Sequence, residues 1–181
     1  MGARVNILDV SASRLAYLDD VFGNSVTTLM SHDENIHNAV VGSDLVIGAV
    51  LIPGAKAPNL VTEEMVKKMK PGSVIVDVAV DQGGCVETAE VTSHDKPIML
   101  KHGVLHYAVP NIPGAVSHTS TYALTNVTLK YARDIARHGL EEAVRRDEAL
   151  RRGVNCYRGK VTHAAVAQSL GEKSVELATL V

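Results

Sequence analysis

The amino-acid sequence predicts an α/β fold with a parallel sheet, and three observations support this prediction. A β-branched apolar run, residues 74–80, follows a Pro71-Gly72 turn and is followed by polar residues and paired glycines. A second apolar run, residues 44–52, stops at Pro53. Residues 62–70 between the runs have a helical pattern, and the right-handed crossover rule makes strands joined in this way parallel neighbours. Polar side chains at the carboxyl ends of such strands mark the edge where α/β proteins bind ligands.

Before residue 44 the sequence predicts two further strands, each followed by a helix. Residues 5–8 predict a short strand that ends at Asp9, and a serine-rich turn then leads into a helix. Residues 26–30 predict a second strand, followed by a helix that Asp33 caps and that Gly42 ends. The chain therefore begins with alternating strands and helices.

The helix at residues 62–70 has the clearest boundaries. Thr62 caps it, glutamates occupy its first turn and lysines its last, as the helix dipole favours. Beyond the run at 74–80 the sequence predicts strands at 98–100 and 104–109, a long helix from Ser117 or Thr119 to Gly139, and helices at 141–152 and 160–170. Residues after Gly171 are expected to fray. The predicted divisions are a domain of residues 1–116, helices of residues 117–170 and a tail of residues 171–181.

Composition limits the classes of partner. The chain has 181 residues, 46% of them hydrophobic, and its net charge of -2 provides no basic surface for nucleic acid. The N-terminal apolar stretch is too short and too interrupted for a signal peptide or a spanning helix. Cys85 and Cys156 lack the spacing of a disulfide framework or a zinc ribbon. We therefore expect a cytoplasmic protein that binds a small molecule and neither nucleic acid nor a membrane.

Asp9 has two interpretations. In a dinucleotide-binding fold, an acid at the tip of the second strand accepts hydrogen bonds from the adenosine ribose, and its charge favours NAD over NADP. Asp also commonly caps a following helix, and the local pattern does not decide between the two. The 14 glycines never form G-x-G, so the phosphate-binding glycine loop is absent. With nothing before the strand at 5–8, a Rossmann-like sheet is expected to lack its first, central strand.

Four segments resemble the family of alanine dehydrogenase and nicotinamide nucleotide transhydrogenase, and alanine dehydrogenase more closely. They are Gly48–Pro58, Met69–Gly72, Val78–Cys85 and Thr119–Asn126, and the resemblance covers most of residues 1 to about 165. It implies an NAD-dependent oxidoreductase that interconverts L-alanine and pyruvate with ammonia, as a homo-oligomer that is a hexamer in the family. It also implies that this chain is the C-terminal part, without the substrate domain on which its last helices pack in the family.

The resemblance also implies roles for individual residues. The implied cofactor-binding positions are Asp9, Arg14, Ser31, Val50, Leu51, Val78, Ala79, Val80, Asp81, Val109, Asn111 and Ile112. Val50 and Leu51 resemble the adenosine side of a strand tip, where they are equally well explained as core residues. Residues 78–80 resemble a backbone platform beside the nicotinamide ribose, and Asn111 a residue beside nicotinamide and substrate. We expect Asp9, Leu51, Asp81 and Asn111 to converge on one crevice.

Asp81 resembles the catalytic carboxylate of the family. Oxidation of an amino acid transfers hydride to NAD and then adds water to an iminium, and these steps move protons. A carboxylate that is partly buried at a strand end has its pKa raised toward neutrality, as a proton shuttle requires. The sequence therefore predicts partial burial of Asp81.

Asp134 and His138 are four residues apart on the long helix and face the same way. They resemble a magnesium-contacting pair of the family, which would add Mg²⁺ to NAD as a cofactor. An exposed ion pair on one helix face is the alternative explanation.

Three functions remain open from the sequence. The first is the C-terminal part of an alanine dehydrogenase with little activity by itself. The second is a non-enzymatic truncated remnant, or a nucleotide-binding subunit that depends on a partner for the missing half. The third is a transhydrogenase-like component, which the segments from Gly48 to Asn126 disfavour.

Overall fold

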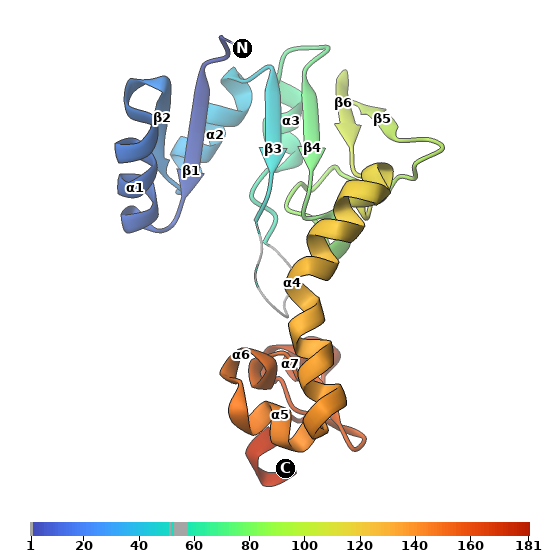
Figure 1. Ribbon diagram of the computed structural model, residues 1–181. Helices are drawn as coiled ribbons and strands as arrows, with labels where there is room; N and C mark the ends of the chain where they lie inside the picture. Colours follow the sequence, from blue (N-terminus) through green and yellow to red (C-terminus); the bar gives the residue numbers. More distant parts are fainter. Residues whose placement is uncertain (1, 51, 53–57) are drawn as a thin grey trace. The chain divides into compact units, whose positions relative to one another are not determined.

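The structure is a computed structural model that describes residues 2–50, 52 and 58–181 (Figure 1). Of the described residues, 2–50 and 58–110 form one compact unit, and residue 52 with residues 111–181 forms the second. This division falls earlier than the boundary after residue 116 predicted from the sequence. Among the described residues, no helix is both long and apolar enough to cross a membrane.

The first unit alternates strands and helices, as predicted. Its elements are β1 (Val5–Asp9), α1 (Ala12–Phe22), the 3-10 helix η1 (Gly23–Ser25), β2 (Val26–Met30), α2 (Asp33–Gly42), β3 (Leu45–Gly48), α3 (Glu63–Lys68), β4 (Val74–Asp77), the 3-10 helix η2 (Val80–Gln82), β5 (Ile98–Lys101) and β6 (Val104–Tyr107). The strands β3 and β4 are shorter than the apolar runs that predicted them. The apolar runs therefore located both strands but overestimated their lengths.

The strands of the first unit form two sheets, in which every pair except β5 and β6 is parallel. β1 pairs in parallel with β2, while a separate sheet has the order β3-β4-β6-β5, in which only β5 is antiparallel to its neighbour. Figure 1 shows β1 and β3 on either side of a position that no described strand fills, so β2, β1, β3 and β4 follow the doubly wound order. The predicted α/β fold without its first strand is confirmed.

One apolar core joins the two sheets. It lies between α2, α3 and one face of the strands, and its most buried members include Val66 and Ile75, both 0% exposed. Leu8 of β1 and Val46 of β3 both pack against this core, to which α2 contributes Ile36 and Val40. α2 therefore holds β1 and β3 in one unit although they are not hydrogen-bonded to each other.

The helix caps are partly as predicted. The N–H of Met65 donates to Oγ1 of Thr62 at 3.3 Å, which confirms the cap of α3. The prediction that Asp33 caps α2 is wrong, because Asp33 lies in the first turn and the N–H of Asn35 donates to Nδ1 of His32 at 3.4 Å. Asp33 still carries a negative charge where the helix dipole favours one.

The second unit is mainly helical. Its elements are the 3-10 helix η3 (Ile112–Val116), α4 (Ser117–His138), α5 (Leu140–Arg146), α6 (Glu148–Arg152), β7 (Cys156–Tyr157), β8 (Lys160–Val161), α7 (Ala164–Leu170) and the 3-10 helix η4 (Leu177–Thr179). The predicted helix at 141–152 is divided, because the side chain of Asp147 caps a new helix by accepting the N–H of Leu150 at 3.0 Å. The division separates α5 from α6.

Two predictions for the C-terminal residues are wrong. Residues 160 and 161 form a strand rather than the start of a helix, because Arg158 and Gly159 adopt positive φ and close a tight hairpin with β7. The tail is not frayed: the N–H of Val175 donates to the carbonyl of Val161 at 2.8 Å, and Leu177 is 9% exposed. A main-chain hydrogen bond to β8 and the burial of Leu177 order this segment.

Candidate functional site

Polar residues lie at one edge of the first unit, where the parallel strands end (Figure 1). Asp9 is the last residue of β1, Val50 follows β3 by two residues, and the loop of residues 78–86 follows β4. Carboxyl ends of parallel strands form the ligand-binding edge in this architecture. The structure thus places the predicted residues Asp9 and Asp81 at the same edge.

Asp9, Arg14 and Ser31 are neighbours at this edge. The N–H of Ser11 donates to Oδ1 of Asp9 at 2.8 Å, and the N–H of Arg14 donates to Oγ of Ser11 at 3.3 Å. The N–H of Ser31 donates to the carbonyl of Asp9 at 2.9 Å. Because Ser11 is the N-cap of α1, the capping interpretation of Asp9 is wrong. The half-buried carboxylate of Asp9 is held by one oxygen, and among the described residues no group donates to Oδ2.

A buried aspartate, Asp77, organises the loop after β4. It is 0% exposed, and its carboxylate accepts the N–H groups of Ala79 at 3.0 Å, Cys85 at 2.9 Å and Val86 at 3.2 Å. Hydrogen bonds to an ionised group are roughly twice as strong as neutral ones. The carboxylate therefore folds the loop back onto the end of β4. No role was predicted for Asp77, although an acid inside an apolar run must find such partners when it is buried.

Two positions of this region require glycine, because neighbouring side chains leave no room for a Cβ atom. A Cβ on Gly48 would lie 2.4 Å from Sγ of Cys85, and a Cβ on Gly84 would lie 2.7 Å from Oδ2 of Asp77. Gly84 also has φ +71°, which residues with a side chain rarely adopt. Both glycines let the loop pack directly against β3 and β4.

Asp81 lies in η2 and is exposed. The predicted partial burial of Asp81 is therefore wrong, because the strand ends at Asp77 and the buried carboxylate is that of Asp77. Val78 is 47% exposed, whereas the side chains of Ala79 and Val80 are buried. The role of residues 78–80 as a backbone platform beside the nicotinamide ribose stays a prediction.

The other residues predicted to contact the cofactor differ in burial, and some of them belong to the second unit. Val50 is half-buried against the core, as its alternative interpretation predicted, and Val109 is 1% exposed, so its role as a cofactor contact stays a prediction. Leu51 lies outside the described residues. Asn111 and Ile112 belong to the second unit, where Asn111 has φ 52° and lines an open hollow with residues of η3 and α4. The convergence of all four strand tips on one crevice stays a prediction.

Asp134 and His138 contact each other on α4, with 3.7 Å between Oδ1 and Nε2. Nε2 of His138 is also 3.4 Å from Nη1 of Arg146. Within the described ranges, no group of three or more His, Cys, Asp and Glu side chains is placed to hold a metal ion. The observed contact is that of an i,i+4 pair, and magnesium binding stays a prediction.

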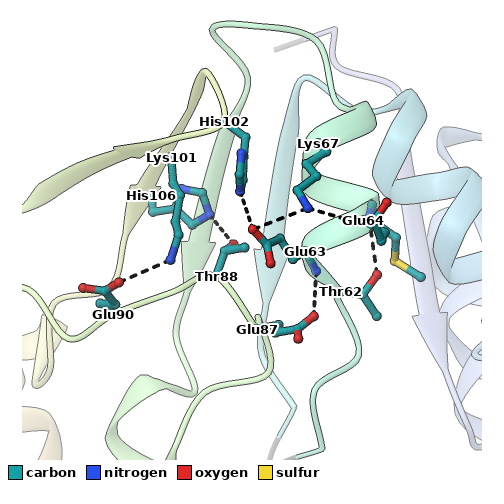
Figure 2. Close-up of polar contacts among 11 residues, drawn as sticks. Thr62, Glu63, Glu64, Lys67, Glu87, Thr88, Glu90, Lys101, His102 and His106 are labelled. Atoms are coloured by element: carbon teal, nitrogen blue, oxygen red, sulfur yellow. Dashed lines mark hydrogen bonds and ion pairs between the residues drawn. The ribbon is translucent and has the colours of Figure 1, made fainter.

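Figure 2 shows how the segment after the loop is fixed to its neighbours. The N–H of Glu63, at the start of α3, donates to Oε2 of Glu87 at 2.7 Å, and Nε2 of His102 lies 2.7 Å from Oε1 of Glu63. The His102 contact, and then the charge of Lys67, hold the pKa of Glu63 below its usual value. These contacts connect α3, the segment after the loop and the β5–β6 hairpin.

His106 anchors the same segment from within the sheet. It is 0% exposed, its Nδ1 lies 3.0 Å from the carbonyl of Val104, and its Nε2 lies 2.8 Å from Oγ1 of Thr88 (Figure 2). Because a carbonyl only accepts, Nδ1 carries the proton, and Nε2 accepts the hydroxyl of Thr88. Burial disfavours the imidazolium and lowers the pKa of His106. No role was predicted for this histidine, since its partner Thr88 lies 18 residues away in the chain.

Parallel strands on both sides of an unfilled central position, with carboxylates at their carboxyl ends, define a doubly wound α/β domain. Residues 1–164 match the family alanine dehydrogenase/PNT, C-terminal domain, and the chain belongs to this family. The resemblance noted in the sequence is therefore confirmed.

Individual relatives agree with this assignment. Alanine dehydrogenase of Methanococcus maripaludis is 64% identical over 170 residues, with 93% of this chain and 46% of the relative covered. Alanine dehydrogenase of Bacillus subtilis is 60% identical over 176 residues, with 97% and 47% covered. The chain spans about half the length of the curated relatives it matches.

Two solved structures support the prediction that the chain is more similar to alanine dehydrogenase than to transhydrogenase. A structure of L-alanine dehydrogenase superposes with a TM-score of 0.82 at 50% identity, covering 94% of this chain and 47% of that one. A transhydrogenase from Sinorhizobium meliloti gives a TM-score of 0.65 at 30% identity, covering 91% and 43%. The closer likeness is to alanine dehydrogenase.

Proposed function

We propose that this chain is the C-terminal, NAD-binding part of an alanine dehydrogenase, which converts L-alanine, NAD⁺ and water into pyruvate, ammonia and NADH. The observation that carries the proposal is the common edge of Asp9 and Asp81, in a chain 60% identical to an alanine dehydrogenase. NAD, when bound, supplies the hydride acceptor. By itself the chain is expected to show little or no turnover.

The residues at the edge fit a dinucleotide in two places. Oδ2 of Asp9 faces no donor among the described residues, while Oδ1 is held by Ser11, so the carboxylate is oriented to accept two ribose hydroxyls. Its negative charge disfavours a 2′-phosphate, which selects NAD over NADP. The main chain of residues 78–80 provides the surface for the nicotinamide ribose. The exposed carboxylate of Asp81 is accessible to the substrate and to the water that adds to it.

The chain lacks the third part of a dinucleotide site. None of its 14 glycines forms the G-x-G that cradles a pyrophosphate. Without this cradle we expect weak binding of NADH and no productive position for L-alanine. A nucleotide-binding subunit that depends on a partner is therefore the second candidate function, and the unfilled position between β1 and β3 favours it.

The role of Asp81 is tested in a complete enzyme, a chimera in which this chain replaces the matched part of the Bacillus subtilis alanine dehydrogenase. We expect Asp81→Asn in this chimera to lower kcat by about 100-fold or more, as loss of a general acid or base does, with NADH affinity changed less than about threefold. Steady-state rates and NADH titration measure the two quantities. Equal losses in both would show that this aspartate binds the nucleotide and transfers no proton.

The matched control is Asp20→Asn in the same chimera, which changes an exposed acid near the C-terminal end of α1. It removes the same charge away from the carboxyl edge and should leave both quantities unchanged. The 181-residue chain is assayed in parallel for NADH formation from L-alanine. Turnover at the rate of the complete relative would contradict the expected dependence on the missing half.

A further inference from the structure

Thr88 and His106 form a buried polar pair between two segments that lead to the candidate site. Thr88 is 2% exposed and follows the loop of residues 78–86 by two residues. His106 is 0% exposed and lies in β6, the strand that leads to Val109. Oγ1 of Thr88 is 2.8 Å from Nε2 of His106 (Figure 2). One side-chain hydrogen bond therefore connects the segment after the loop with β6.

β6 is the fixed side of this connection. It pairs with β4 and with β5, so that His106 lies in register between Ile75 and Met99. Residues in register on neighbouring strands point to the same face of a sheet, and Ile75 is 0% exposed in the core. The carbonyl of Val104 holds Nδ1 of His106 at 3.0 Å. The imidazole is therefore fixed by contacts that do not involve Thr88.

The loop that carries Asp81 is closed at both of its ends by Asp77. At the start of the loop, the carboxylate of Asp77 accepts the N–H of Ala79 at 3.0 Å. At its end, the same carboxylate accepts the N–H groups of Cys85 at 2.9 Å and Val86 at 3.2 Å. The closed form of the loop thus requires Val86 to stay beside the end of β4. A displacement of the segment that follows Val86 would open the loop and move Asp81.

Two contacts of different strength hold the segment that follows Val86. Toward α3, Oε2 of Glu87 accepts the N–H of Glu63 at 2.7 Å, in an exposed position where water can replace either partner. Toward the sheet, Thr88 donates its hydroxyl to His106, and both side chains are buried. Loss of one partner of a buried hydrogen bond leaves the other unsatisfied, which is strongly unfavourable. The contact of Thr88 therefore resists displacement of the segment more than the contact of Glu87 does.

We propose that Thr88 is a positioning residue for the reaction, which acts through its hydrogen bond to His106 to hold the loop that presents Asp81. The inference rests on the proposed role of Asp81 as the carboxylate that transfers protons. The hydroxyl of Thr88 is buried and acts on the reaction only through the position of the loop. A misplacement of a reacting group by about 1 Å can lower the rate by about 100-fold. The position of this segment therefore affects kcat.

Two variants of Thr88, made in the chimera with the Bacillus subtilis enzyme, separate the hydroxyl from the shape of the side chain. Val keeps the branched shape without the hydroxyl, and Ser keeps the hydroxyl. We expect Thr88→Val to lower kcat of the folded enzyme by about tenfold or more, with NADH affinity changed less than about threefold. Thr88→Ser should keep kcat within about threefold. Unchanged kcat in Thr88→Val, or equal losses in the two variants, would overturn the proposal.

Thr92→Val is the matched control, because Oγ1 of Thr92 donates to the carbonyl of Pro97 at 3.2 Å rather than to His106. It should keep kcat within about twofold.

Hydrogen exchange in the same chimera reports the position of the loop without turnover. Thr88→Val should speed exchange of residues 83–88 by about tenfold or more, since local opening exposes their N–H groups, and Thr92→Val should not. Unchanged kcat in the Asp81→Asn chimera would contradict the proposed function. Unchanged exchange in Thr88→Val would contradict the hold of Thr88 on the loop, so the two failures are distinguishable.

Discussion

Asp77 and Asp81 lie close together in the chain, but one carboxylate is buried and the other is exposed. Asp77 is 0% exposed and accepts main-chain N–H groups, whereas Asp81 is exposed in η2. Burial with complete hydrogen bonding suits a carboxylate that holds a loop, and exposure suits one that meets a ligand. Asp77 therefore helps to determine the position of Asp81 in the loop.

His106 gives the first prediction at the residue scale. Its pKa in the folded chain is lowered by burial from an ordinary value of 6.5. Below pH 6.5 the unfolded chain binds a proton that the folded chain does not bind, so the free energy of unfolding falls as pH falls. We expect this contribution to be full above pH 6.5 and to decline below it, by at most about 1.4 kcal/mol per pH unit for one proton.

Urea unfolding between pH 5 and pH 8 measures this effect. His106→Gln removes the titrating group and should flatten the decline below pH 6.5. His94→Gln, which changes an exposed histidine, should retain it. An unchanged slope in His106→Gln would assign the pH dependence to other groups.

At the scale of elements, the loop after β4 depends on Gly84. Ala at this position has two costs: about 1–2 kcal/mol for the left-handed backbone, and roughly 1–3 kcal/mol for the contact of its Cβ with Asp77. Gly72 has φ +87° and no atom within 4 Å of the same Cβ position, so Gly72→Ala has only the first cost. We expect Gly84→Ala to lower the free energy of unfolding by about 1–3 kcal/mol more than Gly72→Ala does. Equal losses, measured by denaturant unfolding, would show that the loop moves away from Asp77.

The sequence predicts the elements whose causes are local. Thr62 and the charges after it define α3, and β-branched runs locate β3 and β4. The ends of these strands were misplaced because contacts remote in sequence decide them: Asp77 ends β4 by binding the N–H groups of Cys85 and Val86. The hairpin of β7 and β8 escaped prediction for a similar reason, since its strands have two residues each and show no periodicity.

The candidate site, like the fold, could be predicted from the sequence only where local pattern decides it. Asp9 follows a short apolar strand, so its place at the carboxyl edge could be predicted from local pattern, and the contacts of Ser31 with it support that placement. The exposure of Asp81 could not be predicted, because it depends on the turn that Asp77 closes through partners up to nine residues away. The family resemblance supplied the roles, which spacing alone does not define.

At the scale of the whole molecule, apolar side chains remain at the surface of both units. Leu45 and Ile47 are exposed in the first unit, and α4 of the second unit has no buried residue in its 22 positions. Its exposed apolar residues include Leu124 at 62% and Val127 at 60%. Contiguous apolar surface of this kind promotes association. We therefore expect the chain, at micromolar concentration and without a partner, to form oligomers whose mass rises with concentration.

Sedimentation velocity measures this association, and salt identifies its cause. Because apolar contacts strengthen with sulfate whereas exposed charge pairs are screened, association should increase in ammonium sulfate. Leu124→Lys should lower the weight-average mass, since it places a charge on the exposed face of α4. Leu170→Lys makes the same change at a residue of 64% exposure at the end of α7 and should leave the mass unchanged. If both variants lowered the mass equally, net charge rather than the face of α4 would control association, and the α4 surface would have no special part in it.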